Sequence, residues 1–120
     1  MIKKFDWKKK SAIYIGRFQP FHEGHKKMFL KTLKKNLQVT ILVMDSFGIN
    51  KKNPFKFSYV KKVINKNLKE HKNKYVIIKI PTVSEVVYGR KVGYKIRKIK
   101  LYEKIEKISA TKIRKKIFKK

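Results

Sequence analysis

Residues 39–44 read VTILVM, a continuous run of apolar and β-branched side chains with the length of a β-strand. A run of this kind is typical of a parallel sheet that is covered on both faces. Two similar segments flank it, SAIYIG at 11–16 and YVIIKI at 75–80. Between these segments, residues 22–37 and 57–68 repeat apolar side chains with a helical period. Strands that alternate with helices predict a βαβ parallel sheet.

The rest of the chain extends the same architecture. Residues 85–88 are expected to form a short fourth strand and 94–101 a half-exposed strand, and Ser109 is placed to open a last helix. No repeat, linker or shift in composition divides the sequence. The prediction is an α/β parallel sheet flanked by helices, in a single domain over 1–120.

The loop after residues 39–44 contains two features of interest. Asn53 and Pro54 are expected to start the helix over 57–68, as its N-cap and first turn. Asp45, at the end of the predicted strand, either faces a second substrate or a hydrated Mg²⁺, or simply caps a turn.

The composition excludes several classes of protein. An apolar fraction of 42% excludes a disordered tail, and the absence of cysteine excludes disulfides, thiol catalysis and Cys-based zinc sites. No apolar run approaches the roughly 20 residues of a membrane span, and residues 1–7 lack the apolar core of a signal peptide. We therefore expect a soluble, cytoplasmic protein with no membrane partner.

The charge is extreme, with 35 Lys plus Arg against 7 Asp plus Glu and a net charge of +28. Its sign predicts polyanionic partners such as nucleotides or nucleic acid. Codon bias in an AT-rich genome would explain the excess of lysine over arginine but not the scarcity of acids. Whether the charge serves a function stays open, as does the oligomeric state, with a homo-oligomer allowed.

The segment GRFQPFHEGH, residues 16–25, links the first predicted strand to the first helix. It therefore lies at the carboxyl end of the sheet, where ligands bind in open α/β folds. His22 and His25 share one face of the first helical turn, and Gly24 removes a side chain where a ligand could approach. Free N–H groups and positive potential at a helix start suit an anionic phosphate. The alternative is a pair of surface histidines at an ordinary helix cap, which the ten-residue context disfavours.

The segment ISATKIR, residues 108–114, opens the last predicted helix. Ser109 suits an N-cap, which leaves Thr111 without a special role and Arg114 as a solvated charge. In the functional interpretation the two hydroxyls and the Arg114 guanidinium bind phosphate oxygens. One detail favours this interpretation, because three of the four arginines lie in candidate ligand loops: Arg17, Arg90 and Arg114.

These two segments carry a resemblance to a known family. GRFQPFHEGH resembles the H-x-G-H signature of the nucleotidyltransferase superfamily, which includes cytidylyltransferases, NMN adenylyltransferases and pantetheine-phosphate adenylyltransferases. ISATKIR resembles its second signature, I-S-x-T-x-x-R, and the order along the chain also matches. The resemblance implies a Rossmann-like fold, an NTP donor, a small phosphorylated acceptor and Mg²⁺ carried by the NTP phosphates. No protein ligand set for a metal is identified.

The resemblance also implies roles for individual residues. His22, His25 and Arg114 would be catalytic, with the histidines stabilising the triphosphate and the charge that develops at the α-phosphorus. Ser109, Thr111 and Arg114 would hold the β- and γ-phosphates, which leave as pyrophosphate. An acceptor phosphate oxygen attacks directly, so positioning and charge neutralisation suffice. The absence of a covalent-catalysis triad is expected for this chemistry, and the sequence also contains no phosphate-loop, G-x-G-x-x-G or nucleophile-elbow motif.

The remaining candidates would contact the nucleotide. By position, Gly16, Arg17 and Phe18 would reach it through the first loop, and Gly24 would pack near the base or ribose. The segment 88–94 is the expected base-side loop, with Arg90 available for phosphate or base, or else a glycine-rich turn between two strands.

The donor stays open between ATP and CTP, and the acceptor is not identified. GRFQPFHEGH and Asn53-Pro54-Phe55 resemble the archaeal-type NMN adenylyltransferases, whereas the short chain resembles small cytidylyltransferase-like proteins. Two other functions remain as alternatives. One is a basic nucleic-acid-binding module, for which weak, non-specific and salt-sensitive binding is expected in any case. The other is a nucleotide-binding relative without turnover.

Overall fold

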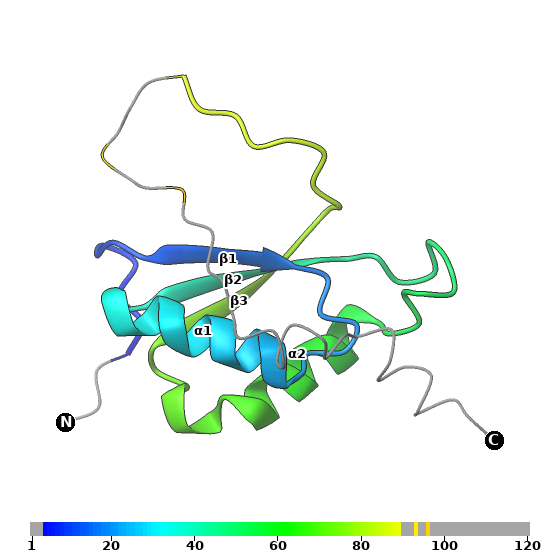
Figure 1. Ribbon diagram of the computed structural model, residues 1–120, viewed down its shortest axis with the longest axis horizontal. Helices are drawn as coiled ribbons and strands as arrows, with labels where there is room; N and C mark the ends of the chain where they lie inside the picture. Colours follow the sequence, from blue (N-terminus) through cyan, green and yellow to red (C-terminus); the bar gives the residue numbers. More distant parts are fainter. Residues whose placement is uncertain (1–3, 90–92, 94–95, 97–120) are drawn as a thin grey trace.

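The computed structural model describes residues 4–89, 93 and 96. Three parallel strands form one sheet in the order β1-β2-β3: β1 (Ala12–Gly16), β2 (Val39–Met44) and β3 (Tyr75–Ile80). Two helices and a short 3-10 turn connect them: α1 (Glu23–Lys35), α2 (Phe57–Asn67) and η1 (Lys69–His71). This confirms the predicted fold class, a Rossmann-like α/β sheet flanked by helices (Figure 1).

The strand register aligns the carboxyl ends of the sheet. β2 lies in the centre, with Gly16 of β1 opposite Val43, and Val43 opposite Lys79 of β3. The loops that follow β1 and β2 therefore leave from the same edge. This edge carries the segment 16–25, as the parallel arrangement requires.

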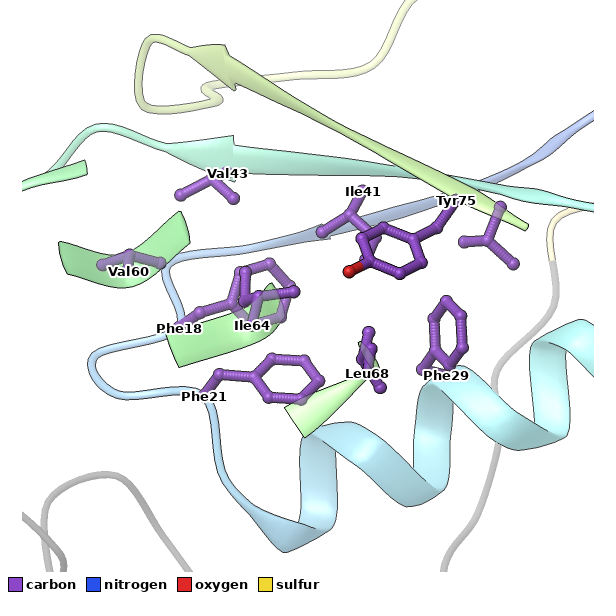
Figure 2. Packing of buried hydrophobic residues seen from close by; sticks show 10 residues of the cluster. Phe18, Phe21, Phe29, Ile41, Val43, Val60, Ile64, Leu68 and Tyr75 are labelled. Carbon is purple, nitrogen blue, oxygen red and sulfur yellow. The ribbon is translucent and has the colours of Figure 1, made fainter. Parts of the chain in front are cut away.

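Both helices pack on one face of the sheet (Figure 1). Right-handed crossovers that step in one direction across a sheet put their helices on the same side. The core lies between the sheet and the two helices (Figure 2). Alternate residues of β2 form its sheet side, where Val39, Ile41 and Val43 are fully buried. Helix residues such as Phe29 and Ile64 pack onto them. No helix in the part of the chain that the structure describes is long and apolar enough to cross a bilayer.

The opposite face of the sheet is less covered than the sequence predicts. The apolar run in β2 indicates burial on both faces, yet Leu42 and Met44 are only half-buried. Ile13 of β1, on the same face, is 63% exposed. The physical reason is that, within residues 4–89, both helices lie on the other side.

Helix α2 begins later than predicted. Asn53 and Pro54 do not cap it, because the N-cap is Lys56, with an extended backbone. Asn53 instead closes the preceding loop, where its side-chain amide donates to Oδ1 of Asn50 at 2.7 Å and its carbonyl accepts from Gly48 N–H at 3.0 Å. The backbone of Phe55 is held by another side chain, described below, so the helix starts only after it.

The expected strand over 85–88 is absent, and this prediction is wrong. The chain leaves β3 at Pro81, which has no N–H to donate to a ladder, and runs away from the sheet as irregular backbone (Figure 1). Val86 and Val87 are both exposed. β-branched residues form a strand only beside a neighbour that pairs their backbone groups, and the described sheet contains only β1, β2 and β3. The predicted helix from Ser109 falls outside the described residues, as does the predicted strand over 94–101 apart from Ile96.

Candidate functional site

The turn after β1 is shaped by the contact between Gly16 and Phe18. Phe18 adopts a left-handed backbone conformation, with φ of 52°, which folds its ring back under the strand end. A Cβ atom on residue 16 would lie only 2.7 Å from Cζ of that ring, so glycine is required for the close approach. The Phe18 side chain is 2% exposed and points into the core (Figure 2).

Aromatic rings hold His25 in place. The Phe18 ring meets the His25 imidazole edge-on at a centroid distance of 5.0 Å, and the Phe21 ring stacks on it at 5.4 Å. On its other side, the His22 imidazole stacks at 3.8 Å. These contacts restrict the orientation of the His25 ring.

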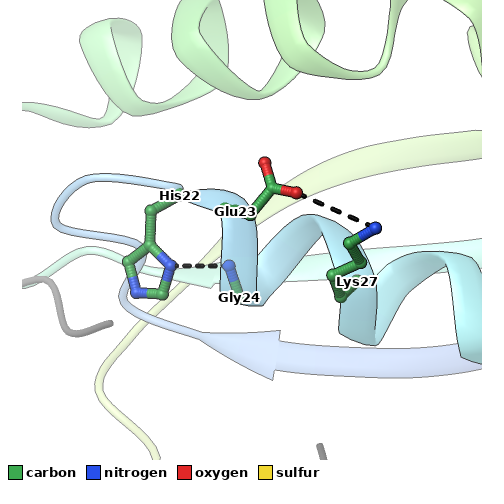
Figure 3. Close-up of polar contacts among 4 residues, drawn as sticks. All are labelled: His22, Glu23, Gly24 and Lys27. Carbon is green, nitrogen blue, oxygen red and sulfur yellow. Dashed lines mark hydrogen bonds and ion pairs between the residues drawn. The ribbon is translucent and has the colours of Figure 1, made fainter. Parts of the chain in front are cut away.

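The two histidines also cap helix α1. His22 is the N-cap residue, and its Nδ1 accepts a hydrogen bond from Gly24 N–H at 3.0 Å (Figure 3). In return, Nδ1 of His25 accepts from His22 N–H at 3.1 Å. The pair is a capping box built from imidazoles, where serine or threonine with glutamate is the usual choice. The spacing H-x-G-H thus has a structural explanation in addition to a functional one.

This hydrogen bonding determines which ring nitrogen carries the proton. A nitrogen that accepts a hydrogen bond is unprotonated, and a neutral imidazole has one N–H. Since Nδ1 is the acceptor in both His22 and His25, both rings carry their proton on Nε2. The site therefore presents two Nε2–H donors, oriented by the helix start.

Both rings are neutral at physiological pH. Burial lowers the pKa of His22, and burial together with the adjacent His22 lowers the pKa of His25 to about 3. Burial disfavours the charged form of each imidazole, and a charge on His22 would oppose one on His25. In this state each ring is a neutral hydrogen-bond donor.

The sequence predicts free N–H groups at this helix start, and in the structure some of these groups already have partners. The N–H groups of His22 and Gly24 are occupied by the two imidazoles. What the helix offers an anion is the positive end of its dipole together with the two Nε2–H groups. Glu23, in the same turn, is turned outward and pairs with Lys27 at 3.9 Å (Figure 3).

The other predicted site residues divide into two groups. Arg17 is exposed in the loop after β1, Gly24 is buried in the first turn of α1, and Asp45 is exposed directly after β2. Asp45 N–H donates to the carbonyl of Ile80 at 2.8 Å, which keeps Asp45 at the carboxyl edge of the sheet. The remaining candidates lie outside the described residues: Arg90, Ser109, Thr111 and Arg114.

Sequence reasoning missed the residue that joins the two loops at this edge. The buried side chain of Gln19 bridges to Phe55, where its Nε2 donates to the carbonyl at 2.9 Å and its Oε1 accepts from the N–H at 2.9 Å. The two residues are 36 positions apart in sequence. The only available signal was a polar residue inside the GRFQPF segment, and this does not reveal its partner.

The described residues contain no three His, Asp or Glu side chains close enough together to hold a metal ion. Asp45 is exposed directly after β2 and belongs to no such group. A contact of Asp45 with a hydrated Mg²⁺ stays a prediction.

Comparison with known proteins gives two matches. The model of the cytidylyltransferase-like family matches residues 13–59, which extend from β1 to the start of α2. A nicotinamide-nucleotide adenylyltransferase from Methanococcus aeolicus is 29% identical over 133 aligned positions, covering 88% of this chain and 76% of the relative. No solved structure matches the chain at comparable significance. Together with the parallel α/β sheet, these matches support a similarity of the chain to the superfamily of cytidylyltransferase-like and NMN-adenylyltransferase-like nucleotidyltransferases.

Proposed function

We propose that the protein transfers a nucleotidyl group, AMP or CMP, from an NTP to a small phosphorylated acceptor and releases pyrophosphate. The family and the relative support a nucleotidyltransferase-type activity in general. The single observation that carries the proposal is the pair His22 and His25. Each has its Nδ1 engaged by a backbone N–H, which leaves two Nε2–H donors at a helix start. This arrangement suits the oxygens of a polyphosphate.

The reaction requires little beyond this. An anionic oxygen of the acceptor phosphate attacks the α-phosphorus, the new P–O bond forms in line, and the bond to the bridging oxygen of the β-phosphate breaks. No proton has to be removed from the acceptor. The neutral imidazoles donate to oxygens that gain charge as pyrophosphate departs, which is where preorganised donors contribute most to the rate.

We assign the remaining contacts with the nucleotide and the acceptor by the position of each residue in the sequence. Arg17 and the backbone around Gly16 and Phe18 would line the donor site at the end of β1. Ser109, Thr111 and Arg114 would bind the β- and γ-phosphates, and Arg90 a phosphate or the base. Asp45 would face the acceptor, because it follows β2 at the same edge of the sheet.

ATP is our first choice of donor. The adenylyltransferase relative is aligned over 88% of this chain, whereas the cytidylyltransferase-like match is confined to residues 13–59. The name of that relative makes nicotinamide mononucleotide the first acceptor to test. CTP with a phosphorylated alcohol is the alternative pair.

Pyrophosphate release tests the proposal. The full chain is incubated with ATP, CTP, GTP or UTP and a panel of phosphorylated acceptors, with Mg²⁺ present. We expect release that depends on one donor and one acceptor together. Binding of a nucleotide without release under any pair would show a nucleotide-binding relative without turnover.

Variants of Arg114 test whether this residue contributes to donor binding as well as to the reaction rate. The β- and γ-phosphates are charged before and after the reaction, so Arg114→Ala should raise the apparent KM for the donor as well as lower the rate. Arg114→Lys should restore only part of the loss, because an ammonium cannot reproduce the guanidinium fork. Full recovery by lysine would show that Arg114 acts only as a general positive charge.

A further inference from the structure

A groove lies where α2 and η1 border the first turns of α1. Its volume is about 470 Å³. It is lined by residues from α1, α2 and η1: Lys26, Tyr59, Val63, Lys66, Asn67, Lys69 and Glu70. The residues of α2 in this set recur every three or four positions, so they form one continuous stripe next to the stripe that Val60 and Ile64 bury in the core.

The groove is positively charged. Three lysines line it against one glutamate. Lys66 and Lys69 are exposed, and they lie where α2 passes into η1, at the end of the groove opposite Tyr59. From Tyr59 to Lys66 the helix rises about 10 Å, so charge and ring are spread along an extended track. A track of this kind fits a chain of phosphates better than a single small anion.

The aromatic ring at the other end is both accessible and supported. Tyr59 is 42% exposed, and its ring stacks on Phe55 at a centroid distance of 4.7 Å. Phe55 is in turn held through its backbone by Gln19. A fixed, partly exposed ring offers a flat surface on which an unpaired base can stack.

We propose that this groove binds single-stranded nucleic acid, with phosphates along Lys66 and Lys69 and one base stacked on Tyr59. The proposal is independent of the nucleotidyl transfer proposed above. Net charge alone would attract any polyanion, but an exposed aromatic ring in the charged track distinguishes a single strand from a duplex. Bases of a duplex stack on one another and leave no free face for Tyr59.

The test uses the full chain and a fluorescently labelled oligonucleotide of uniform sequence. Binding is followed by anisotropy from low to physiological salt. Tyr59→Ala should weaken binding about five- to a hundredfold, the range for losing one stacked base. Tyr59→Leu, which keeps an apolar contact with Phe55 but has no aromatic face, should weaken it to a similar extent. The double variant Lys66→Ala/Lys69→Ala should reduce the slope of log K against log salt by about 1.4, since each phosphate contact on a single strand contributes about 0.7.

A double variant with the same charge change is the control. Lys34→Ala/Lys35→Ala removes two exposed lysines from the last turn of α1, neither of which lines the groove. Its binding should stay within about twofold of the wild-type chain, because those lysines contribute only distant, screened charge. Thermal unfolding of each variant confirms that the fold persists.

Three results would each overturn the proposal. The first is equal loss of affinity in the control pair, which would show that only total charge matters. The second is unchanged binding by Tyr59→Leu. The third is competition by duplex or by inorganic polyphosphate as effective as competition by the single strand, because neither can stack a base on Tyr59.

Discussion

The backbone N–H of His22 donates to Nδ1 of His25 across 3.1 Å, while the two imidazole rings stack with centroids 3.8 Å apart. The residue that caps helix α1 and the residue three positions later are therefore one unit. Their Nδ1 hydrogen bonds stabilise the helix start and orient the opposite ring nitrogens, Nε2, which we propose for chemistry. A substitution at either position affects both properties, and experiments must separate them.

His25→Ala tests the chemical role. We expect a loss of about a hundred- to a thousandfold in kcat, with a much smaller change in donor affinity, because a preorganised donor contributes mainly in the transition state. Steady-state kinetics measure kcat, and equilibrium binding of the nucleotide measures the donor affinity. Loss of the cap should also cost about 1 kcal/mol of stability.

The third histidine is the matched control for this variant. His71 lies in η1, an element that does not carry the candidate site, and its ring centroid is 6.0 Å from that of Phe29. His71→Ala should keep kcat near that of the wild-type chain. If His71→Ala and His25→Ala lose activity to the same extent, His25 has no special role in the reaction.

The stability of the fold should depend on pH through His25. Burial and the adjacent His22 lower the pKa of His25 to about 3, against about 6.5 in the unfolded chain. Between these values the unfolded chain binds a proton that the folded chain does not. The stabilisation is therefore complete above about pH 6.5 and is lost as the pH falls toward 3, by up to about 1.4 kcal/mol per pH unit.

Urea unfolding at intervals from pH 7 to pH 4 measures this dependence. His25→Asn retains a polar side chain at N3 but cannot titrate in this range, so its stability should fall less steeply with decreasing pH. Identical slopes for the variant and the wild-type chain would show that His25 is protonated as easily in the folded state as in the unfolded one.

Gly16→Ala should disturb the site without touching a candidate catalytic group. The new methyl group would lie 2.7 Å from Cζ of Phe18, whose ring is packed against Tyr14, Phe21 and His25 and cannot move freely. We expect a loss of about 1–3 kcal/mol in the free energy of unfolding, as for other overpacked cores. Gly89→Ala is the control, since a methyl group there meets no atom within 4 Å. Equal stability of the two variants would contradict the contact.

Gln19→Ala should loosen the connection between the two loops. It removes the partner of the Phe55 N–H and carbonyl, and we expect a cost of about 1–3 kcal/mol, measured by urea unfolding. Gln19→Glu has nearly the same volume but cannot donate to the Phe55 carbonyl. If the glutamate variant were as stable as the wild-type chain, packing and not hydrogen bonding would explain the role of Gln19.

Much of the architecture could be predicted because its signals are local. The strands at 39–44 and 75–80 have the predicted bounds, since continuous β-branched runs next to turn residues encode them directly. Helix α1 ends two residues before the predicted limit, at Lys35, where the Asn36 side chain donates to the Thr32 carbonyl at 2.8 Å. The segment 16–25 was assigned to the carboxyl edge from chain order alone, and the register of the sheet puts it there.

Other features depend on partners that are remote in sequence. The valines at 86 and 87 have the composition of a strand but no neighbour to pair with. The segment at 53–55 has the composition of a helix start, but the Gln19 side chain takes both backbone groups of Phe55. Phe18 stands in a loop motif, yet its ring belongs to the core. In each case tertiary contacts overrode the local preference.

The sequence by itself determined the α/β class, the order of the elements and the presence of two histidines three residues apart at a helix start. Only the tertiary structure decided their state: stacked, capping the helix, neutral, and with the proton on Nε2. The reason is physical. Residue types and spacing specify which groups are available, whereas the pKa of an imidazole and the direction of its N–H depend on burial, neighbouring rings and hydrogen-bond partners, which exist only once the chain has folded.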